Sequence, residues 1–424
     1  MFECLANDKK RYTWQDIQKQ LKADEVAIEM IRTQYYDKKW TDSVIYMALI
    51  IKKDTKNQPE MVFLADGKSL EKDDINYYRN NIKFKKTDKF SYNNFWKPIK
   101  NKIGTAKKVY FSADGVYHQL NLLTLQNPET GKYVSEETNI QLLSNTKDLV
   151  LFAKSKKINK NLKDYKLHLF GFPDYTDGKA TKNNASNIDR SLFVTKLDTT
   201  QRFFGMNGSI STLPGTKTEV ENIGNFAKLQ NIKAITHTGE QASEANIKKL
   251  SNPDILHIAT HGFFLSDLPV SENDKLGAEK RQTQVENPLL RCGLLLADAE
   301  NGLKNGEIEG KENGVLTAQE AMNLNLDNTD LVVMSACETG LGEIINGEGV
   351  FGLQRAFQQA GAKTILMSLW KVDDAATQEM MSLFYENILT KKLSKREAFT
   401  QAQNKLKEKY PSPYFWGAFV MVGE

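Results

Sequence analysis

Residues 255–262 read ILHIATHG and residues 331–340 read LVVMSACETG, and these two stretches decide the predicted fold. Each is a short apolar run that leads into a reactive side chain, His261 after the first and Cys337 after the second. Such continuous apolar runs are typical of parallel strands that are buried on both faces. Because the carboxyl ends of parallel strands gather at one edge of a sheet, we expect His261 and Cys337 at the same edge.

Helical and strand patterns alternate around these runs from Lys217 onward. The alternation predicts a mainly parallel sheet covered by helices. Capping boxes at Thr317 and Ser394 predict the starts of two helices. The further predicted helices are 219–229, 243–250, 350–360 and 375–389, and the further predicted strands are 234–238, 294–297, 364–369 and 419–422.

The amino-terminal part begins with three stretches rich in Val, Ile, Met and Tyr, which predict an antiparallel meander. They span residues 25–35, 43–52 and 60–64. Helices at 72–82 and 93–103 and buried strands at 108–112 and 166–170 are predicted to follow. Two long polar stretches, 178–214 and 266–288, are predicted loops, and loops of that length are usually functional or mobile.

Composition excludes several classes of protein. The 424 residues carry 57 Lys and Arg against 53 Asp and Glu, and a net charge of +4 gives no global field that favours nucleic acid or a membrane surface. The three cysteines, Cys4, Cys292 and Cys337, are too few and too far apart for a disulfide framework or a zinc cluster. No apolar run reaches membrane-spanning length and no signal peptide is evident, so we expect a soluble, cytoplasmic protein.

A cysteine and a histidine at one sheet edge suit nucleophilic acyl transfer. The imidazole of His261 can take the thiol proton of Cys337 and later protonate the leaving amine. The main-chain N–H groups of Gly262 and Cys337 are candidates for holding the oxyanion. This chemistry needs no cofactor. The alternative for Cys337 is a buried structural thiol, and the alternative for His261 is a capping or core histidine.

The sequence argues against two other kinds of site. His257 and His261 would share one strand face, but no further His or Cys completes a metal site, so we expect His257 to hydrogen-bond within the sheet. The glycine-rich run 340–349 matches neither nucleotide-binding pattern and predicts a catalytic-site loop instead.

Several motifs in the same order resemble one known family. They are HIATHGFF, GVLTAQEAMNLNL, LVVMSACETGLGEIINGEGVF and AQNKLKEKYPSPYFWGAFVMVG. Together they resemble the CHAT family, caspase-like peptidases that are often attached to tetratricopeptide repeats. The resemblance is strong over 255–423 and looser in the preceding lobe, where it includes Ala113-Asp114-Gly115.

The resemblance implies a cysteine endopeptidase of the clan of caspases, gingipains and separases. His261 then matches the general base and Cys337 the nucleophile. The implied fold is a caspase-like α/β/α sandwich with a mainly parallel sheet, 216–424, preceded by a pseudo-caspase-like supporting lobe, 1–215. True caspases carry the histidine about 50 residues before the cysteine. The gap here is 337 − 261 = 76, which argues against a true caspase.

The resemblance also suggests where the residue before the cut would bind. In this clan the segment after the strand predicted at 364–369 lines that pocket, and here it contains Trp370, Asp373 and Asp374. Separase-like sequences place an acidic residue at the end of this segment, so Asp374, with Asp373, would favour a basic side chain. The alternative is that these aspartates cap the following helix, and Lys371 counts against the pocket.

Our main hypothesis is a cytoplasmic CHAT cysteine protease with protein substrates, regulated by a partner or by an attached tetratricopeptide-repeat region. The long loops are candidates for a gating flap or a self-cleavage site. The alternatives are a non-catalytic scaffold that uses the fold for interaction and, third, an acyltransferase or hydrolase with a non-peptide substrate.

Overall fold

The computed structural model describes residues 11–64, 66–154, 160–176, 210–264, 287–305, 312–336, 343–345, 349–371 and 373–424. The chain forms two compact units, each of which is made of segments that are not consecutive in the sequence. Unit 1 comprises Met1–Asn159, Ile344–Val350 and Ser412–Glu424, and unit 2 comprises Lys160–Glu343 and Phe351–Pro411.

Unit 2 is built on a parallel sheet with the strand order β15-β12-β8-β6-β7. Every neighbouring pair in this order is parallel. The sheet confirms the parallel arrangement predicted from the apolar runs. Its strands are β6 (Lys166–Pro173), β7 (Lys233–Gly239), β8 (Ile255–Ala259), β12 (Leu331–Ser335) and β15 (Thr364–Ser368).

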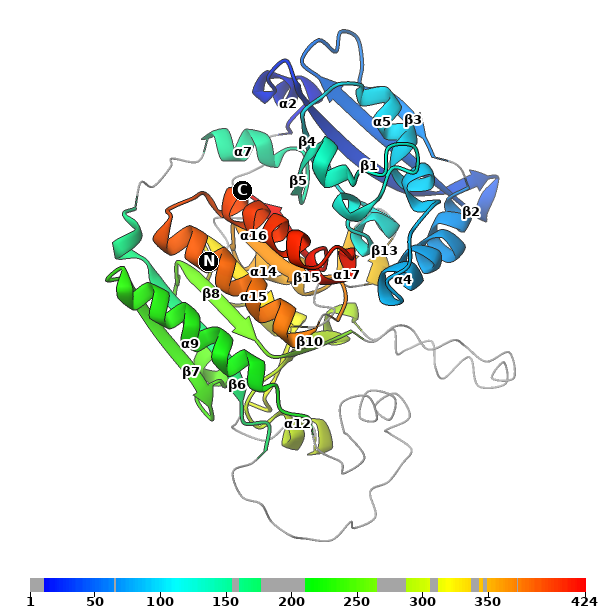
Figure 1. Ribbon diagram of the computed structural model, residues 1–424. Coiled ribbons are helices and arrows are strands. Elements are labelled where there is room, and N and C mark those ends of the chain that lie inside the picture. The colour runs from blue at the N-terminus through cyan, green and yellow to red at the C-terminus, as the bar shows by residue number, and fades with distance from the viewer. Residues whose placement is uncertain are drawn as a thin grey trace, which may run out of the picture. The chain divides into compact units, whose positions relative to one another are not determined.

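β8, β12 and β15 are buried at every position, so both faces of this sheet are covered. Three long helices lie side by side on one face (Figure 1). They are α9 (Pro214–Leu229), α15 (Asp374–Tyr385) and α16 (Lys395–Lys409); the shorter helices of unit 2 are α10 (Glu244–Lys248), α12 (Ala299–Asn305), α13 (Ala318–Ala321) and α14 (Leu353–Gln359). The predicted α/β fold class with a mainly parallel sheet is confirmed.

The helix boundaries follow local sequence signals. Both predicted capping boxes are present, at Thr317 before α13 and at Ser394 before α16. α9 begins at Pro214, five residues before the predicted start, because proline fits the first turn of a helix. α14 begins at Leu353 rather than at residue 350, because the preceding residues form a short strand.

Two small sheets were not predicted as sheets, although the predicted strand 294–297 overlaps one strand of the first. One has the order β11-β10-β9, in which β10 (Cys292–Leu295) runs antiparallel to both β9 (His261–Phe264) and β11 (Val315–Thr317). The other pairs β13 (Glu343–Ile345) with β14 (Gly349–Phe351). The first of these carries His261 and therefore belongs to the description of the site.

Unit 1 contains a mixed sheet with the order β3-β2-β1-β4-β5-β16. β1, β2 and β3 form the predicted antiparallel meander, whereas β1, β4, β5 and β16 run parallel to one another. The strands are β1 (Glu25–Asp37), β2 (Lys39–Lys52), β3 (Glu60–Phe63), β4 (Lys108–Ser112), β5 (Asn139–Leu143) and β16 (Phe419–Gly423).

Helices also pack on the sheet of unit 1. α2 and α7 bury Ile17, Leu21 and Leu149 against Ala27 and Ile51 of the meander. The helices of unit 1 are α2 (Trp14–Gln20), α3 (Gly67–Ser69), α4 (Ile75–Lys83), α5 (Lys97–Ile103), α6 (Val134–Glu137), α7 (Asp148–Lys154) and α17 (Pro413–Trp416), with π-helical turns at Leu70–Asp74 and Tyr92–Trp96.

The predicted lobe boundary between residues 215 and 216 stays a prediction. β6 precedes that boundary and belongs to unit 2, while β16 follows it and belongs to unit 1. Among the helices that the structure describes, none combines the length and the apolar character needed to cross a membrane.

Candidate active site

His261 stands where the chain leaves the main sheet of unit 2. β8 ends at Ala259, and β9 begins at His261, which lies opposite Leu295 of β10. Thr260 lies between the two strands and is buried. Its hydroxyl donates to the carbonyl of Leu295 and lies 2.9 Å from the hydroxyl oxygen of Tyr175. These bonds fix the backbone immediately before His261.

A main-chain carbonyl orients the ring of His261. Its Nε2 lies 2.7 Å from the carbonyl oxygen of Ser211. A carbonyl oxygen can only accept a hydrogen bond, so Nε2 carries the ring proton. In the neutral imidazole the basic lone pair then belongs to Nδ1. The ring of Tyr175 packs beside His261 with 5.5 Å between ring centroids.

The surroundings of His261 favour its neutral form. Burial lowers the pKa of His261 below its ordinary value of 6.5, and the positive charge of Lys371 acts in the same direction. The hydrogen bond to Ser211 and the negative charge of Asp374 raise this pKa and partly offset the shift. A histidine that is neutral near pH 7 can accept a proton, which is the requirement for a general base.

The predicted common edge for the two reactive residues is confirmed for their strands. β8 and β12 are parallel neighbours, with Ser335 opposite Ala259, so both strands end at the same edge. Ala336, the residue before the cysteine, is buried, and its carbonyl accepts a hydrogen bond from the hydroxyl of Ser368 on β15. Cys337 itself lies outside the described residues, and its role stays a prediction.

Gly262 and the two long loops are the remaining elements that the sequence predicts to take part in catalysis. Gly262 lies in β9 opposite Leu294 and is partly exposed. Its proposed contribution to an oxyanion hole stays a prediction. Of the predicted loops 178–214 and 266–288, residues 178–209 and 266–286 lie outside the described residues, and their role as a flap stays a prediction.

Asp373 and Asp374, the two acidic residues after β15, have different surroundings. The carboxylate of Asp373 caps α15, because its Oδ1 accepts hydrogen bonds from the main-chain N–H groups of Ala375 and Ala376 at 3.1 and 3.2 Å. Asp374 is the first residue of α15 and is exposed, and its charge acts on His261. Substrate binding by Trp370, Asp373 and Asp374 stays a prediction, with a structural role already visible for Asp373.

The prediction that His257 hydrogen-bonds within the sheet is wrong. It is fully buried, and its partners come from the helices on one face of the sheet. Its Nε2 lies 2.9 Å from the Oε1 of Glu219 on α9, and its Nδ1 lies 3.1 Å from the hydroxyl of Tyr385 on α15. These contacts make His257 a structural link between β8 and its covering helices.

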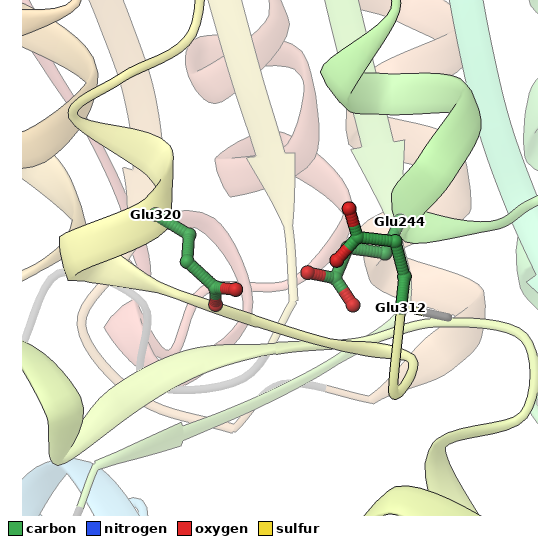
Figure 2. Close-up of side chains that lie close together, drawn as sticks. All are labelled: Glu244, Glu312 and Glu320. Carbon is green, nitrogen blue, oxygen red and sulfur yellow. The ribbon is translucent and has the colours of Figure 1, made fainter. Parts of the chain in front are cut away.

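One cluster of carboxylates has the composition of a cation site. Glu244, Glu312 and Glu320 direct their carboxylates toward one another (Figure 2), with candidate ligand oxygens within 4.8 Å of each other. The ammonium of Lys248 lies 2.6, 2.6 and 3.0 Å from these three carboxylates. The lysine therefore supplies the positive charge that the cluster needs, and we assign no metal to it.

The same cluster holds an unusual carboxyl group. Burial raises the pKa of Glu244 to about 8, although the adjacent ammonium of Lys248 acts in the opposite direction. Glu244 also accepts a hydrogen bond from the main-chain N–H of Gly314 at 3.0 Å. These contacts tie α10 to the segment before β11 and to α13, which explains the cluster as a structural joint.

The residues that sequence reasoning missed are Ser211 and Tyr175. Tyr175 is buried, and burial raises its pKa to about 12, so it stays a neutral phenol beside His261. It closely follows β6, and the rule that functional groups gather beyond the carboxyl ends of parallel strands could have found it. Ser211 acts through its main chain, which leaves no signal in residue type.

Comparison with protein families adds an independent observation. The model of the CHAT domain family matches residues 91–424, which is more than half of the chain. Tetratricopeptide repeat protein 28 from Homo sapiens is 25% identical over 216 residues, and the match covers 50% of this chain and 8% of that protein. The Mus musculus protein of the same name is 25% identical over 217 residues, with the same coverage. The chain thus spans under a tenth of these relatives.

Solved structures with a related arrangement are more distant. The Saccharomyces cerevisiae separase–securin complex at 2.6 Å resolution is 11% identical, with a TM-score of 0.41, and the match covers 80% of this chain and 18% of that chain. The complex of Porphyromonas gingivalis RgpB pro- and mature domains is 11% identical, with a TM-score of 0.44, and the match covers 85% and 77%.

Proposed function

The chain belongs to the CHAT domain family, and from this membership and the surroundings of His261 we propose that it is a cysteine endopeptidase. The observation that carries the proposal is the bond from His261 Nε2 to the Ser211 carbonyl at 2.7 Å, together with the lowered pKa of that ring. A neutral imidazole with its lone pair on Nδ1 is prepared to accept a thiol proton.

The proposed reaction proceeds through a thioester. Nδ1 of His261 takes the thiol proton of Cys337, and the thiolate attacks the carbonyl carbon of the scissile peptide bond. The main-chain N–H groups of Gly262 and Cys337 stabilise the oxyanion that forms. The imidazolium then protonates the departing amine, and water, deprotonated by the same ring, hydrolyses the thioester.

The proposed substrate is a protein cut after a basic residue. Asp374 supports this preference, because it is exposed and lies close enough to His261 for its charge to act on the ring. Asp373 would contribute through its position in the same turn, although its Oδ1 already caps α15. The positive charge of Lys371, also near His261, would favour substrates with an acidic residue elsewhere.

We further propose that a partner or an attached tetratricopeptide-repeat region regulates the peptidase. The support is the identity with Tetratricopeptide repeat protein 28, of which this chain matches only 8%. A cytoplasmic location stays part of this proposal.

A thiol-directed probe tests the proposal most directly. We expect the wild-type chain to be labelled at Cys337 and the Cys337→Ala variant to lose that label while Cys292, which is buried, contributes little. A peptide library that varies the residue before the cut should show cleavage after arginine or lysine, and Asp374→Asn should weaken that preference. Absence of labelling and of cleavage, even with a repeat-containing partner present, would favour a non-catalytic scaffold.

A further inference from the structure

The carbonyl that orients His261 belongs to a short segment, 210–213, which we call the strap. The strap runs directly into α9, which begins at Pro214. Its end next to α9 is fixed by Thr216, whose side chain donates to the carbonyl of Leu213 at 2.7 Å and accepts from the main-chain N–H of Phe172 at 2.9 Å. The position of the Ser211 carbonyl therefore depends on how the other end of the strap is held.

A buried carboxylate holds that other end. The main-chain N–H of Ile210 donates to the Oε1 of Glu300 at 2.7 Å. Ile210 and Glu300 are 4% and 7% exposed, so this bond is shielded from water. A hydrogen bond from an N–H group to an ionised acceptor is stronger than one between neutral groups, and shielding strengthens it further.

Glu300 is itself fixed in place. Its main-chain N–H donates to the carbonyl of Tyr175 at 3.0 Å, and its Oε2 lies 3.3 Å from the ammonium of Lys304. Ile210 and Tyr175 belong to one buried apolar cluster together with Phe263 of β9. The carboxylate thus connects the strap to the tyrosine that packs beside His261.

We propose that Glu300 is a positioning residue for His261. By holding the N–H of Ile210, Glu300 keeps the strap seated, and the Ser211 carbonyl then holds the proton on Nε2 and leaves Nδ1 as the base. The catalytic role of this positioning rests on the proposed function. The orientation of the His261 ring can be measured whether or not the chain cuts peptides. Without an acceptor for the buried N–H of Ile210, the strap would lift and water would replace the Ser211 carbonyl.

Two substitutions separate the acceptor from the charge. Glu300→Gln keeps an oxygen that can accept from Ile210, whereas Glu300→Met has a similar size and no acceptor. Lys304→Met serves as the matched control, because it removes the ion pair with Glu300 and leaves the acceptor intact. All variants are made in the full chain.

The ring proton of His261 is the direct readout. In protein labelled with ¹⁵N-histidine, a ring N–H held by a carbonyl exchanges slowly enough to be observed, and its resonance is assigned by its loss in His261→Gln. We expect this resonance in the wild type, Glu300→Gln and Lys304→Met, and its loss in Glu300→Met. The ring of His257, held between Glu219 and Tyr385, should be unchanged in every variant and so reports an intact fold.

Peptide cleavage provides the second readout. We expect kcat/KM to fall at least about tenfold in Glu300→Met and to stay within about threefold of the wild type in the other two variants. Because Lys371, Asp374 and the Tyr175 ring also face His261, all variants are compared at several pH values.

Retention of the His261 ring proton in Glu300→Met would overturn the inference, and so would its loss in Glu300→Gln or Lys304→Met. A wild-type chain that cuts no peptide would count against the proposed peptidase alone, because the ring proton reports on Glu300 without any turnover.

Discussion

The ends of two parallel strands, one in each unit, occupy equivalent positions in their sheets and have opposite characters. In unit 1, β4 runs parallel to both of its neighbours and leads to Asp114 and Gly115. In unit 2, β8 also runs between two parallel neighbours and leads to His261. Parallel strand ends are where α/β sheets usually carry ligands and catalytic groups, so both ends are candidate sites by position alone.

The β4 end is closed by internal hydrogen bonds. The carboxylate of Asp114 accepts from the main-chain N–H groups of Arg32 and Gly115, both at 2.8 Å. The Arg32 side chain binds both carboxylate oxygens of Glu71, and the Tyr46 hydroxyl donates to the same carboxylate at 2.6 Å. Each of these polar groups is used to hold the backbone or another side chain.

The β8 end is organised around one titratable ring. His261 is partly exposed, its Nε2 bonds to a main-chain carbonyl, and burial holds its pKa below 6.5. At the β4 end the charged side chains hydrogen-bond to one another and to the main chain, whereas at the β8 end a main-chain carbonyl orients one candidate base. The comparison teaches that two strand ends in similar sheet positions can differ in whether their polar groups bond mainly to one another, as at Asp114, or leave a titratable ring oriented by the main chain, as at His261.

Alanine substitutions at the two strand ends are expected to have the largest effects, one on activity and the other on stability. His261→Ala should lower kcat for peptide cleavage about 10³-fold, because general-base catalysis contributes on that scale, with little change in the free energy of unfolding. Asp114→Ala should do the reverse, since two main-chain N–H groups lose their acceptor at a cost of about 2 kcal/mol in stability. Peptide turnover and urea unfolding of both variants measure this crossover.

The crossover has a clear negative outcome. If Asp114→Ala abolished cleavage while the chain remained folded, the β4 end would take part in the reaction and the contrast between the two strand ends would be wrong. Asp114→Asn is the milder control, because its side-chain oxygen can still accept from one of the two N–H groups.

Gly115 tests how tightly the β4 end is closed. Its φ of +57° favours glycine, and a Cβ built there would lie 2.0 Å from the Tyr46 hydroxyl and 2.8 Å from Cδ of Arg32. Gly115→Ala should therefore combine backbone strain with a clash and lower the free energy of unfolding by about 3 kcal/mol. Thermal and urea unfolding measure the loss.

Gly131 provides the matched control for Gly115. Its φ is +69°, but a Cβ built there has nothing within 4 Å. Gly131→Ala should cost only the backbone strain, about 1 kcal/mol. Equal losses for the two alanine variants would mean that Tyr46 and Arg32 move aside easily, and the β4 end would then be less rigid than the hydrogen bonds indicate.

Sequence patterns predicted the strands of the site better than its contacts. The apolar runs predict strands at 255–260 and 331–336, each within one residue of β8 and β12, because a strand buried on both faces leaves a continuous apolar signal. The predicted bonding of His257 was wrong, because its partners Glu219 and Tyr385 come from helices more than 30 residues away in the sequence. Such pairings depend on how helices pack, and one sequence does not encode them in any local period.

The site shows the same limit more sharply. His261 was predicted from its place after a strand, and the CHAT family was identified from its motifs and is confirmed. Ser211 escaped prediction because its contribution is a carbonyl that every residue possesses. Glu300 escaped because a carboxylate that binds a main-chain N–H is indistinguishable in sequence from a surface glutamate. Asp373 illustrates the intermediate case, since its alternative as a helix cap had a recognised pattern.

The smallest expected effect is a shift in the pKa of His261 when a nearby charge is removed. Cleavage should rise with pH through the pKa of His261, which lies below 6.5, because only the neutral ring accepts a proton. Lys371→Met removes a positive charge that lowers this pKa, so the acid limb of kcat/KM should move to higher pH. Asp374→Asn removes a negative charge that raises the pKa, so the limb should move to lower pH.

The size and the sign of these shifts follow from exposure and linkage. Lys371 and Asp374 are exposed, so each shift should be a few tenths of a pH unit, and about 1 M salt should largely remove it. Because the folded-state pKa of His261 is depressed, its contribution to stability is present above 6.5 and is lost as the pH falls through the folded-state pKa. Titration of the His261 ring by NMR checks the shifts without substrate. Shifts of the same sign in both variants would show that the substitutions reorient the ring, and the β8 end would then be held by these charges as well as by Ser211.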